Sequence, residues 1–220
     1  MTRQFPVSLL AAMLVLLVAC AKTDGVKANP GKNSAVMNAQ IMALPAEPLS
    51  AFEQASLLHM REEEKLARDV YQALYAKWGL QQFSNIASSE QRHMDAVLSL
   101  LNKYNLTDPA ANKQPGEFAD AGLQQLYNKL VADGLQSANA ALTVGATIED
   151  LDLFDLAEAI EKSDNQDIDM VYGNLAKGSR NHMRAFNRGL QSSGIIYVPQ
   201  YISQTVFDSI INSAQERGMQ

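Results

Sequence analysis

Apolar residues return every three or four positions through four long stretches of this sequence, and none of these stretches alternates as a β-strand does. This period places apolar side chains on one face of an α-helix. We therefore expect long helices over residues 51–78, 84–104, 137–162 and 163–191, each with one face buried. A shorter amphipathic stretch covers residues 204–214. The sequence thus predicts an all-α fold with a short C-terminal helix.

The connections between the predicted helices indicate how the helices pair. About five residues separate the first two helices, and about two or three separate the last two, so each pair is expected to form an antiparallel hairpin. About thirty residues, with a minor helix near 123–131, separate the hairpins. Two hairpins joined by one long crossover is the arrangement of a ferritin-like four-helix bundle.

The first fifty residues differ in composition from the rest. An apolar run over residues 7–19 follows Arg3 and is too short to span a membrane comfortably, so residues 1–19 are predicted to be an export signal. Residues 20–50 contain several Pro and Gly and few large apolar side chains, which is typical of a flexible tether. The helical domain is therefore expected to occupy residues 51–220. The formal net charge of −6 and the scattered lysines exclude a nucleic-acid-binding surface.

The predicted signal ends in "LVAC", residues 17–20, which resembles the lipobox of bacterial lipoproteins. The resemblance implies that Cys20 is lipidated, becomes the first mature residue and anchors the protein to a membrane. Ala21, rather than Asp, follows Cys20, and by the same resemblance this favours the outer membrane, with the domain facing the periplasm. Cys20 is the only cysteine, so an internal disulfide is excluded. The alternative is an ordinary cleaved signal that leaves a free cysteine.

Polar side chains interrupt the apolar face of each long helix at helical spacing. A buried carboxylate or imidazole is costly unless something pairs with it. Glu90 and His93 are three residues apart and share a helix face, so both can approach one ion. Glu-x-x-His together with glutamates from other helices is the pattern of di-iron carboxylate bundles, which leave open positions for oxygen or peroxide. The predicted ligands are Glu64, Glu90, His93, Glu149 and His182.

Three segments support the same interpretation by resemblance. "REEEKLARDVYQALY", "SSEQRHMDAVLSLL" and "DNQDIDMVYGNLAKGSRNHMRAF" resemble a ferritin-like bacterial and archaeal family catalogued as a domain of unknown function, over roughly residues 52–203. Ferritins and bacterioferritins also place a tyrosine seven residues after the ligand of the first helix. Glu64 and Tyr71 match that spacing, which favours Glu64 over Glu63 as the ligand. The resemblance implies that Tyr71 is a hydrogen-bond or electron donor beside the metal.

The fourth helix departs from the bacterioferritin pattern, because Ser179 stands where the second Glu-x-x-His would have its glutamate. Three carboxylates and two histidines remain, which leaves the second ion short of ligands. Either water, Asp155 or Glu158 completes the set, or only one ion binds well.

The sequence leads us to expect a lipid-anchored envelope protein that binds iron, as two ions or one, and oxidises Fe(II) with oxygen or peroxide. A non-catalytic buffer or carrier for manganese or zinc is the first alternative. A metal-free helical scaffold in the cell envelope is the second. Alanine-rich helix faces leave a homodimer open, and no residue pattern identifies a protein partner or an electron donor.

Overall fold

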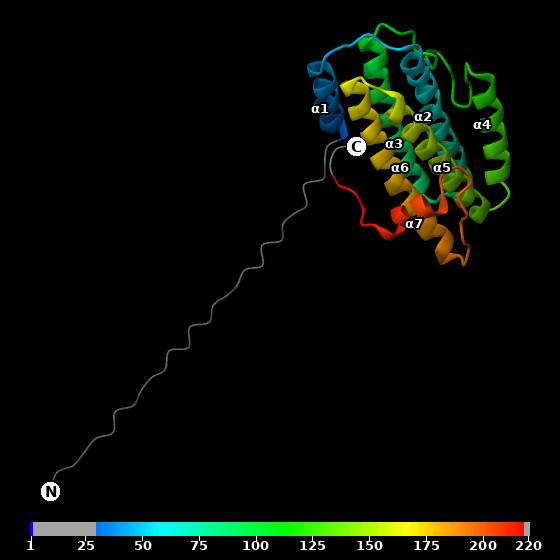
Figure 1. Cartoon of the computed structure of the whole chain (residues 1–220). Coiled ribbons are helices and arrows are strands. Elements are labelled where there is room, and N and C mark those ends of the chain that lie inside the picture. Colours follow the sequence, from blue (N-terminus) through cyan, green and yellow to red (C-terminus); the bar gives the residue numbers. More distant parts are fainter. Residues whose placement is uncertain (2–29, 218–220) are drawn as a thin grey trace.

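The structure is a computed structural model that describes residue 1 and residues 30–217, with side chains described from residue 35 onward. The predicted signal segment and Cys20 lie outside the described residues. The described part of the chain contains no strand and seven helices, which are α1 (Pro30–Ala43), α2 (Ala51–Trp78), α3 (Gln81–Lys103), α4 (Ala121–Gly134), α5 (Ala138–Lys162), α6 (Gln166–Ser192) and α7 (Gln204–Asn212) (Figure 1). The predicted all-α fold is therefore confirmed. Among these described helices, none combines the length and apolar character that crossing a membrane requires.

Two helical hairpins form the body of the bundle. Helices α2 and α3 pack along each other, as do α5 and α6, and these are the two most extensive contacts between helices. The crossover between the hairpins carries α4, which packs on α2 and α5, while α1 packs on α3 and α6. Figure 1 accordingly shows α1 and α4 on opposite sides of the bundle. The order of two hairpins and one crossover agrees with the sequence analysis.

Local signals fix the ends of α2. Ser50 caps the N-terminus, because its side chain accepts a hydrogen bond from the Glu53 backbone and the Glu53 side chain bonds back to Ser50. At the other end, Gly79 adopts φ 64°, a left-handed conformation that costs glycine little and ends the helix. The chain then reverses within two residues, Gly79 and Leu80, before α3 begins. This tight link sets α3 beside α2.

Helix α6 begins at Gln166, three residues after the predicted start at residue 163. The N-cap of α6 is Asn165, and its side chain makes no capping hydrogen bond. The hydroxyl of Ser163 instead donates to Glu53 Oε1 at 3.1 Å. Glu53 thus ties the start of α2 to the link between α5 and α6, a contact that local sequence could not indicate.

Helix α1 lies within residues 20–50, where the sequence analysis placed a flexible tether. The structure differs from that prediction because α1 buries Met37 and Ile41, one helical turn apart, against the bundle. The ammonium group of Lys103 holds the end of α1, donating to the carbonyl oxygens of Ile41 at 2.8 Å and Leu44 at 3.0 Å. Met37, Ile41 and Lys103 thus hold the described part of α1 against the bundle.

Candidate metal centre

The five predicted ligands meet in the interior of the bundle. Helix α2 contributes one residue, α3 two, and α5 and α6 one each. Their side chains form two overlapping groups, in which one ligand atom per residue lies within 4.8 Å of the others: Glu64, Glu90 and His93, and Glu90, Glu149 and His182. All five residues are only 2–6% exposed. The structure therefore brings together every residue that the sequence analysis placed at this site.

Glu90 is the member that both groups share, and each of its oxygens faces a different histidine. Glu90 Oε2 lies 2.7 Å from His93 Nδ1, and Glu90 Oε1 lies 2.9 Å from His182 Nδ1. The first group is completed by Glu64 Oε2, 3.2 Å from His93 Nδ1. The second is completed by Glu149 Oε2, 3.4 Å from His182 Nδ1. A carboxylate placed in this way can bridge two cations.

A glycine on α6 makes room for one of the histidines. The rings of His93 and His182 stack, with centroids 5.7 Å apart and planes 27° apart. A Cβ atom on Gly178 would lie 2.5 Å from His93 Nε2, which is closer than any Cβ approaches another heavy atom in practice. Only glycine at position 178 therefore allows the His93 ring to occupy its position against α6.

Several buried polar atoms in the centre have no hydrogen-bond partner. They include both carboxylate oxygens of Glu63, one oxygen each of Glu64 and Asp152, and the Nε2 atom of His93. A buried polar atom left unpaired costs about 1–3 kcal/mol, so a cluster of them is a strong sign of an additional binding partner. Carboxylate oxygens and imidazole nitrogens are the donors that first-row divalent metals prefer. The residues present fit a metal centre.

A small cavity lies between the carboxylates. The space open to the centre of a water molecule is about 10 Å³, so the cavity has room for one water molecule or one ion. The residues that line it are Glu63, Glu64, Ala67, Glu90, Ile148, Glu149 and Asp152. Both Glu63 and Glu64, the rival candidates on α2, therefore border the same space.

Tyr71 lies beside the centre and donates a hydrogen bond to a predicted ligand on another helix. Its hydroxyl donates to Glu149 Oε1 at 2.5 Å, across the bundle, rather than to Glu64 on its own helix. The ring packs against Phe83 and Phe186 at centroid distances of 5.9 and 5.3 Å. Burial, with the nearby Glu149 carboxylate, raises the pKa of Tyr71 well above its usual value. Tyr71 thus fixes one ligand and remains protonated.

Burial and mutual repulsion shift the acids of the centre. Burial raises the pKa of Glu64 to about 7, although the neighbouring His93 lowers it in part. Burial also raises the pKa values of Glu149 and Asp152. Burial would raise the pKa of Glu90 as well, but the two histidines hold it below its usual value.

The histidines shift in the opposite sense to ordinary buried imidazoles. Burial lowers the pKa of His182, but Glu90 and Glu149 outweigh that effect and raise it to about 10. The carboxylates likewise raise the pKa of His93. Without a cation the centre therefore keeps protons on several acids and on both imidazoles. A metal ion must displace these protons in order to bind.

Asp152, which was not among the predicted ligands, lies one helical turn after Glu149 on α5. Asp152 is buried and accepts a hydrogen bond from the Ser179 hydroxyl. Ser179 therefore positions a carboxylate of α5 where a glutamate on α6 was expected. The spacing Glu149-x-x-Asp152 was the available signal, because residues three apart share a helix face.

The two other candidates for completing the ligand set lie elsewhere. Asp155 contacts His59, and Glu158 pairs with Lys162 at the surface. The prediction that one of them leans into the centre is therefore wrong, because one further turn along α5 carries their side chains away from it.

A surface pocket reaches one edge of the centre. Its volume is about 300 Å³, and helices α1, α3 and α6 form its walls. Its lining includes His93 of α3, Met37 and Asn38 of α1, and Asn174 of α6. Because His93 lines this pocket and also belongs to the first ligand group, the pocket lies next to the centre.

Comparison with known proteins places these observations in a family. A family model described as an uncharacterized protein domain (DUF2202) matches residues 53–214. The uncharacterized protein MJ0754 of Methanocaldococcus jannaschii is 58% identical over 179 residues, which cover 81% of this chain and 97% of that protein. The crystal structure of hypothetical protein MJ0754 from the same archaeon superimposes with a TM-score of 0.78 at 57% identity, covering 79% of this chain and 99% of that one.

Proposed function

Because the chain belongs to the DUF2202 family, whose description states no activity, we propose a function from the geometry of its own buried centre. The protein binds two divalent first-row metal ions in a ferritin-like carboxylate and histidine centre, with iron as the native metal. At this centre it oxidises Fe(II) with dioxygen or peroxide.

The position of Glu90 between two histidines is the observation that supports this proposal most strongly. Each of its oxygens belongs to a different ligand group, so two ions can share one carboxylate. Each ion then has an imidazole of its own and a further glutamate, Glu64 or Glu149. Such an arrangement suits paired ions better than a single ion, for which half of the donors would be superfluous.

The charges of the donors agree with two ions. Glu64, Glu90, Glu149 and Asp152 together carry four negative charges when ionised, which balance two dications if both imidazoles are neutral. The three carboxylates predicted from the sequence carry only three negative charges, one fewer than two dications require. Asp152 removes that deficit and, through Ser179, stands in for the glutamate that α6 lacks.

The surroundings of the centre suit oxidation of a metal substrate. Two Fe(II) ions give up one electron each, and these reduce dioxygen with two protons to hydrogen peroxide, or peroxide with two protons to two waters. Tyr71 holds Glu149 in place, and the ring cluster of Tyr71, Phe83 and Phe186 excludes water from one side. The pocket at His93 gives iron and the oxidant access from the other side.

Anaerobic equilibrium dialysis against Fe(II), followed by admission of oxygen, tests this function. We expect the wild-type protein to bind two ions per chain and to consume oxygen, and Glu90→Gln combined with His182→Ala to lose both properties. Glu161→Gln is the matched control, because it removes an exposed carboxylate from α5 and leaves the centre intact. If the double variant binds as much iron as wild type, the site is wrongly assigned.

The same experiment separates the alternatives. Binding without oxygen consumption would indicate a buffer or carrier, and repetition with Mn(II) or Zn(II) would then identify the preferred metal. Absence of binding by wild type would leave only a metal-free scaffold.

We also propose that Cys20 carries a lipid that anchors the domain to the outer membrane, facing the periplasm. The "LVAC" segment supports this, whereas the similarity to MJ0754 concerns the helical domain and a protein from an archaeon, which lacks an outer membrane. Labelling cells with radioactive palmitate tests the anchor. Wild type should be labelled and Cys20→Ala should not, and equal labelling of both would refute it.

A further inference from the structure

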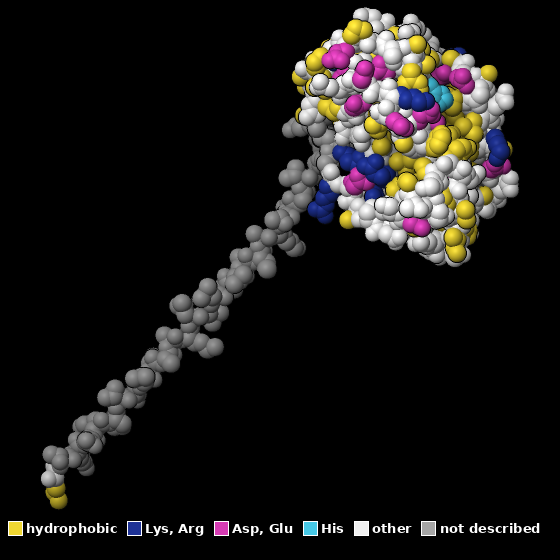
Figure 2. Space-filling model, viewed as in Figure 1, with side chains coloured by type: hydrophobic (Ala, Val, Ile, Leu, Met, Phe, Trp, Pro, Cys, Tyr) yellow, Lys and Arg dark blue, Asp and Glu magenta, His cyan; other side chains and the backbone are white. Residues whose placement is uncertain are grey.

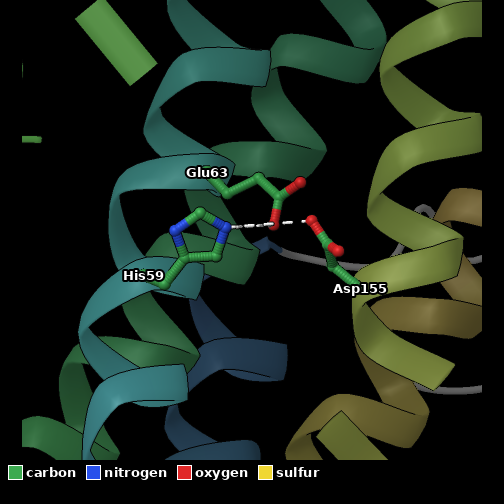
Figure 3. A group of neighbouring side chains, drawn as sticks. All are labelled: His59, Glu63 and Asp155. Carbon is green, nitrogen blue, oxygen red and sulfur yellow. Dashed lines mark ion pairs between the residues drawn. The ribbon is translucent and has the colours of Figure 1, made fainter. Parts of the chain in front are cut away.

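A second cluster of metal-binding side chains lies outside the centre, between α2 and α5. Figure 3 shows its members, His59 and Glu63 from α2 and Asp155 from α5, with their polar atoms directed toward one another. His59 Nε2 lies 3.6 Å from Glu63 Oε2 and 3.8 Å from Asp155 Oδ2. One ligand atom from each residue lies within 4.8 Å of the other two.

Glu63 is the member that calls for a ligand. Its side chain is 3% exposed, and neither of its oxygens has a hydrogen-bond partner. The distance to His59 is too long for a hydrogen bond, and in the described part of the chain no Lys or Arg forms an ion pair with Glu63. Burial, with the nearby Asp152 and Asp155, raises the pKa of Glu63, so this carboxyl group either holds a proton or gives it up to a cation that joins it.

The cluster is open to solvent on its other side. His59 is 45% exposed and Asp155 24%, and both line a shallow surface pocket of about 210 Å³. Figure 2 shows one face of the molecule, on which a histidine side chain lies beside acidic ones. An ion from solution can therefore reach this cluster without any movement of the helices.

Glu63 also borders the internal cavity of the metal centre. It is the one residue of the outer cluster that faces both sites, since His59 and Asp155 do not line that cavity. In addition, the charge balance of the centre is complete with Glu64, Glu90, Glu149 and Asp152. Glu63 is thus a fifth buried carboxylate, which the inner centre does not need for neutrality.

We propose that His59, Glu63 and Asp155 form an outer binding site for one divalent first-row cation, and that Glu63 passes this cation to the buried centre. One imidazole nitrogen and two carboxylates suit Fe(II), Mn(II) or Zn(II), whereas Ca²⁺ and Mg²⁺ prefer oxygen donors alone. Two carboxylates neutralise one dication, and water completes its coordination on the exposed side. Only the transfer to the centre rests on the function proposed above.

Anaerobic dialysis with Co(II), together with its visible absorption, tests the outer site in the full domain. His59→Ala and Asp155→Asn should each weaken binding of the outer ion by about 10–100-fold. At a Co(II) concentration that just fills the wild-type outer site, each variant should therefore bind one ion fewer than wild type. Glu158→Gln, which removes another carboxylate from the same pocket rim, should bind Co(II) as wild type does. If both His59→Ala and Asp155→Asn keep the wild-type number and affinity, the outer site does not exist.

A Glu90→Gln variant separates this inference from the proposed function. It should keep the Co(II) ion that depends on His59 while losing ions from the centre. If His59→Ala loses one ion while Glu90→Gln binds as many ions as wild type, the outer site is supported and the proposed metal binding at the centre is refuted.

The rate of Fe(II) oxidation tests the transfer step. With His59→Ala we expect the rate at low Fe(II) concentration to fall by about tenfold or more and the rate at saturating Fe(II) to stay near wild type. A purely structural role of His59 would lower both rates. If the cobalt experiment shows loss of the outer ion but the rate at low Fe(II) is unchanged, the outer site does not deliver iron.

Discussion

Residues that are not ligands also shape the centre, and Gly178 is the clearest example. Gly178 lies one helical turn before His182 and faces the His93 ring, so one α6 residue admits a ligand of α3. Gly173, on the same helix, has no atom within 4 Å of where its Cβ would be. The two glycines therefore form a natural pair for experiment.

Gly178→Ala should displace the His93 ring and weaken metal binding by about 10–100-fold. Because the added methyl group overpacks the interior, it should also destabilise the protein by about 1–3 kcal/mol. Gly173→Ala should leave metal binding unchanged and stabilise α6 by up to about 1 kcal/mol, since alanine favours the helix. Isothermal titration with Fe(II) and urea unfolding measure both effects. Equal metal affinity of the two variants would contradict the position assigned to His93.

The sequence predicted that Glu90 and His93 lie together because the helical period alone puts them on one face. It could not predict that Tyr71 bonds to Glu149 across the bundle, because that contact depends on how α2 and α5 are rotated against each other. Asp152 was missed for the same reason, since several acids on α5 compete for the inward direction and packing decides among them.

Whole helices differ in how well the local sequence predicts them, as α2 and α1 show. The bounds of α2 were predicted residue for residue, because a strong cap and a glycine mark its ends. Helix α1 was missed because its segment contains proline and glycine, and because from residue 35 onward, where its side chains are described, it buries only Met37 and Ile41. Its docking depends on Lys103, which also pairs with Asp167 at 2.6 Å and so ties α1 to α3 and α6.

Replacement of Ile41 distinguishes a docked helix from a flexible tether. Ile41 is fully buried, so Ile41→Ala should destabilise the protein by about 2–5 kcal/mol. Met42, its neighbour, is 58% exposed, and Met42→Ala should change stability by no more than about 0.5 kcal/mol. Urea unfolding gives both values. A negligible effect of both substitutions would show that α1 does not pack on the bundle in solution.

For the molecule as a whole, burying so many acids and imidazoles costs free energy, and the proposed metal binding would offset that cost. The metal-free protein must keep protons on acids and imidazoles whose pKa values burial and mutual contact have shifted. Folding, proton binding and metal binding are therefore linked, and pH is the variable that separates them.

The stability of the metal-free protein should fall as pH rises. Glu64 has a raised pKa of about 7, so its contribution is complete below its unfolded value of 4.5 and is lost as pH passes 7. The contribution of His182 is complete below 6.5 and is lost as pH passes about 10. Glu90 has a lowered pKa, so its contribution to stability is complete above its unfolded value of 4.5 and is lost only in strong acid.

Saturating metal should reverse this trend, because the ion takes the place of the protons. An ion at a hundredfold excess over its Kd adds about 2.7 kcal/mol. Urea unfolding with chelator and with Mn(II), at about pH 5 and about pH 9, measures the difference. A metal-free protein that becomes more stable over this interval would contradict the protonation described for the centre.

The central claim is that Glu90 bridges two metal ions inside the bundle. Anomalous diffraction at the iron edge, from crystals loaded with Fe(II) without oxygen, tests it most directly. We predict two strong peaks on either side of Glu90, one beside Glu64 and His93 and the other beside Glu149 and His182. Crystals that bind iron elsewhere but show no peak at Glu90 would contradict the claim.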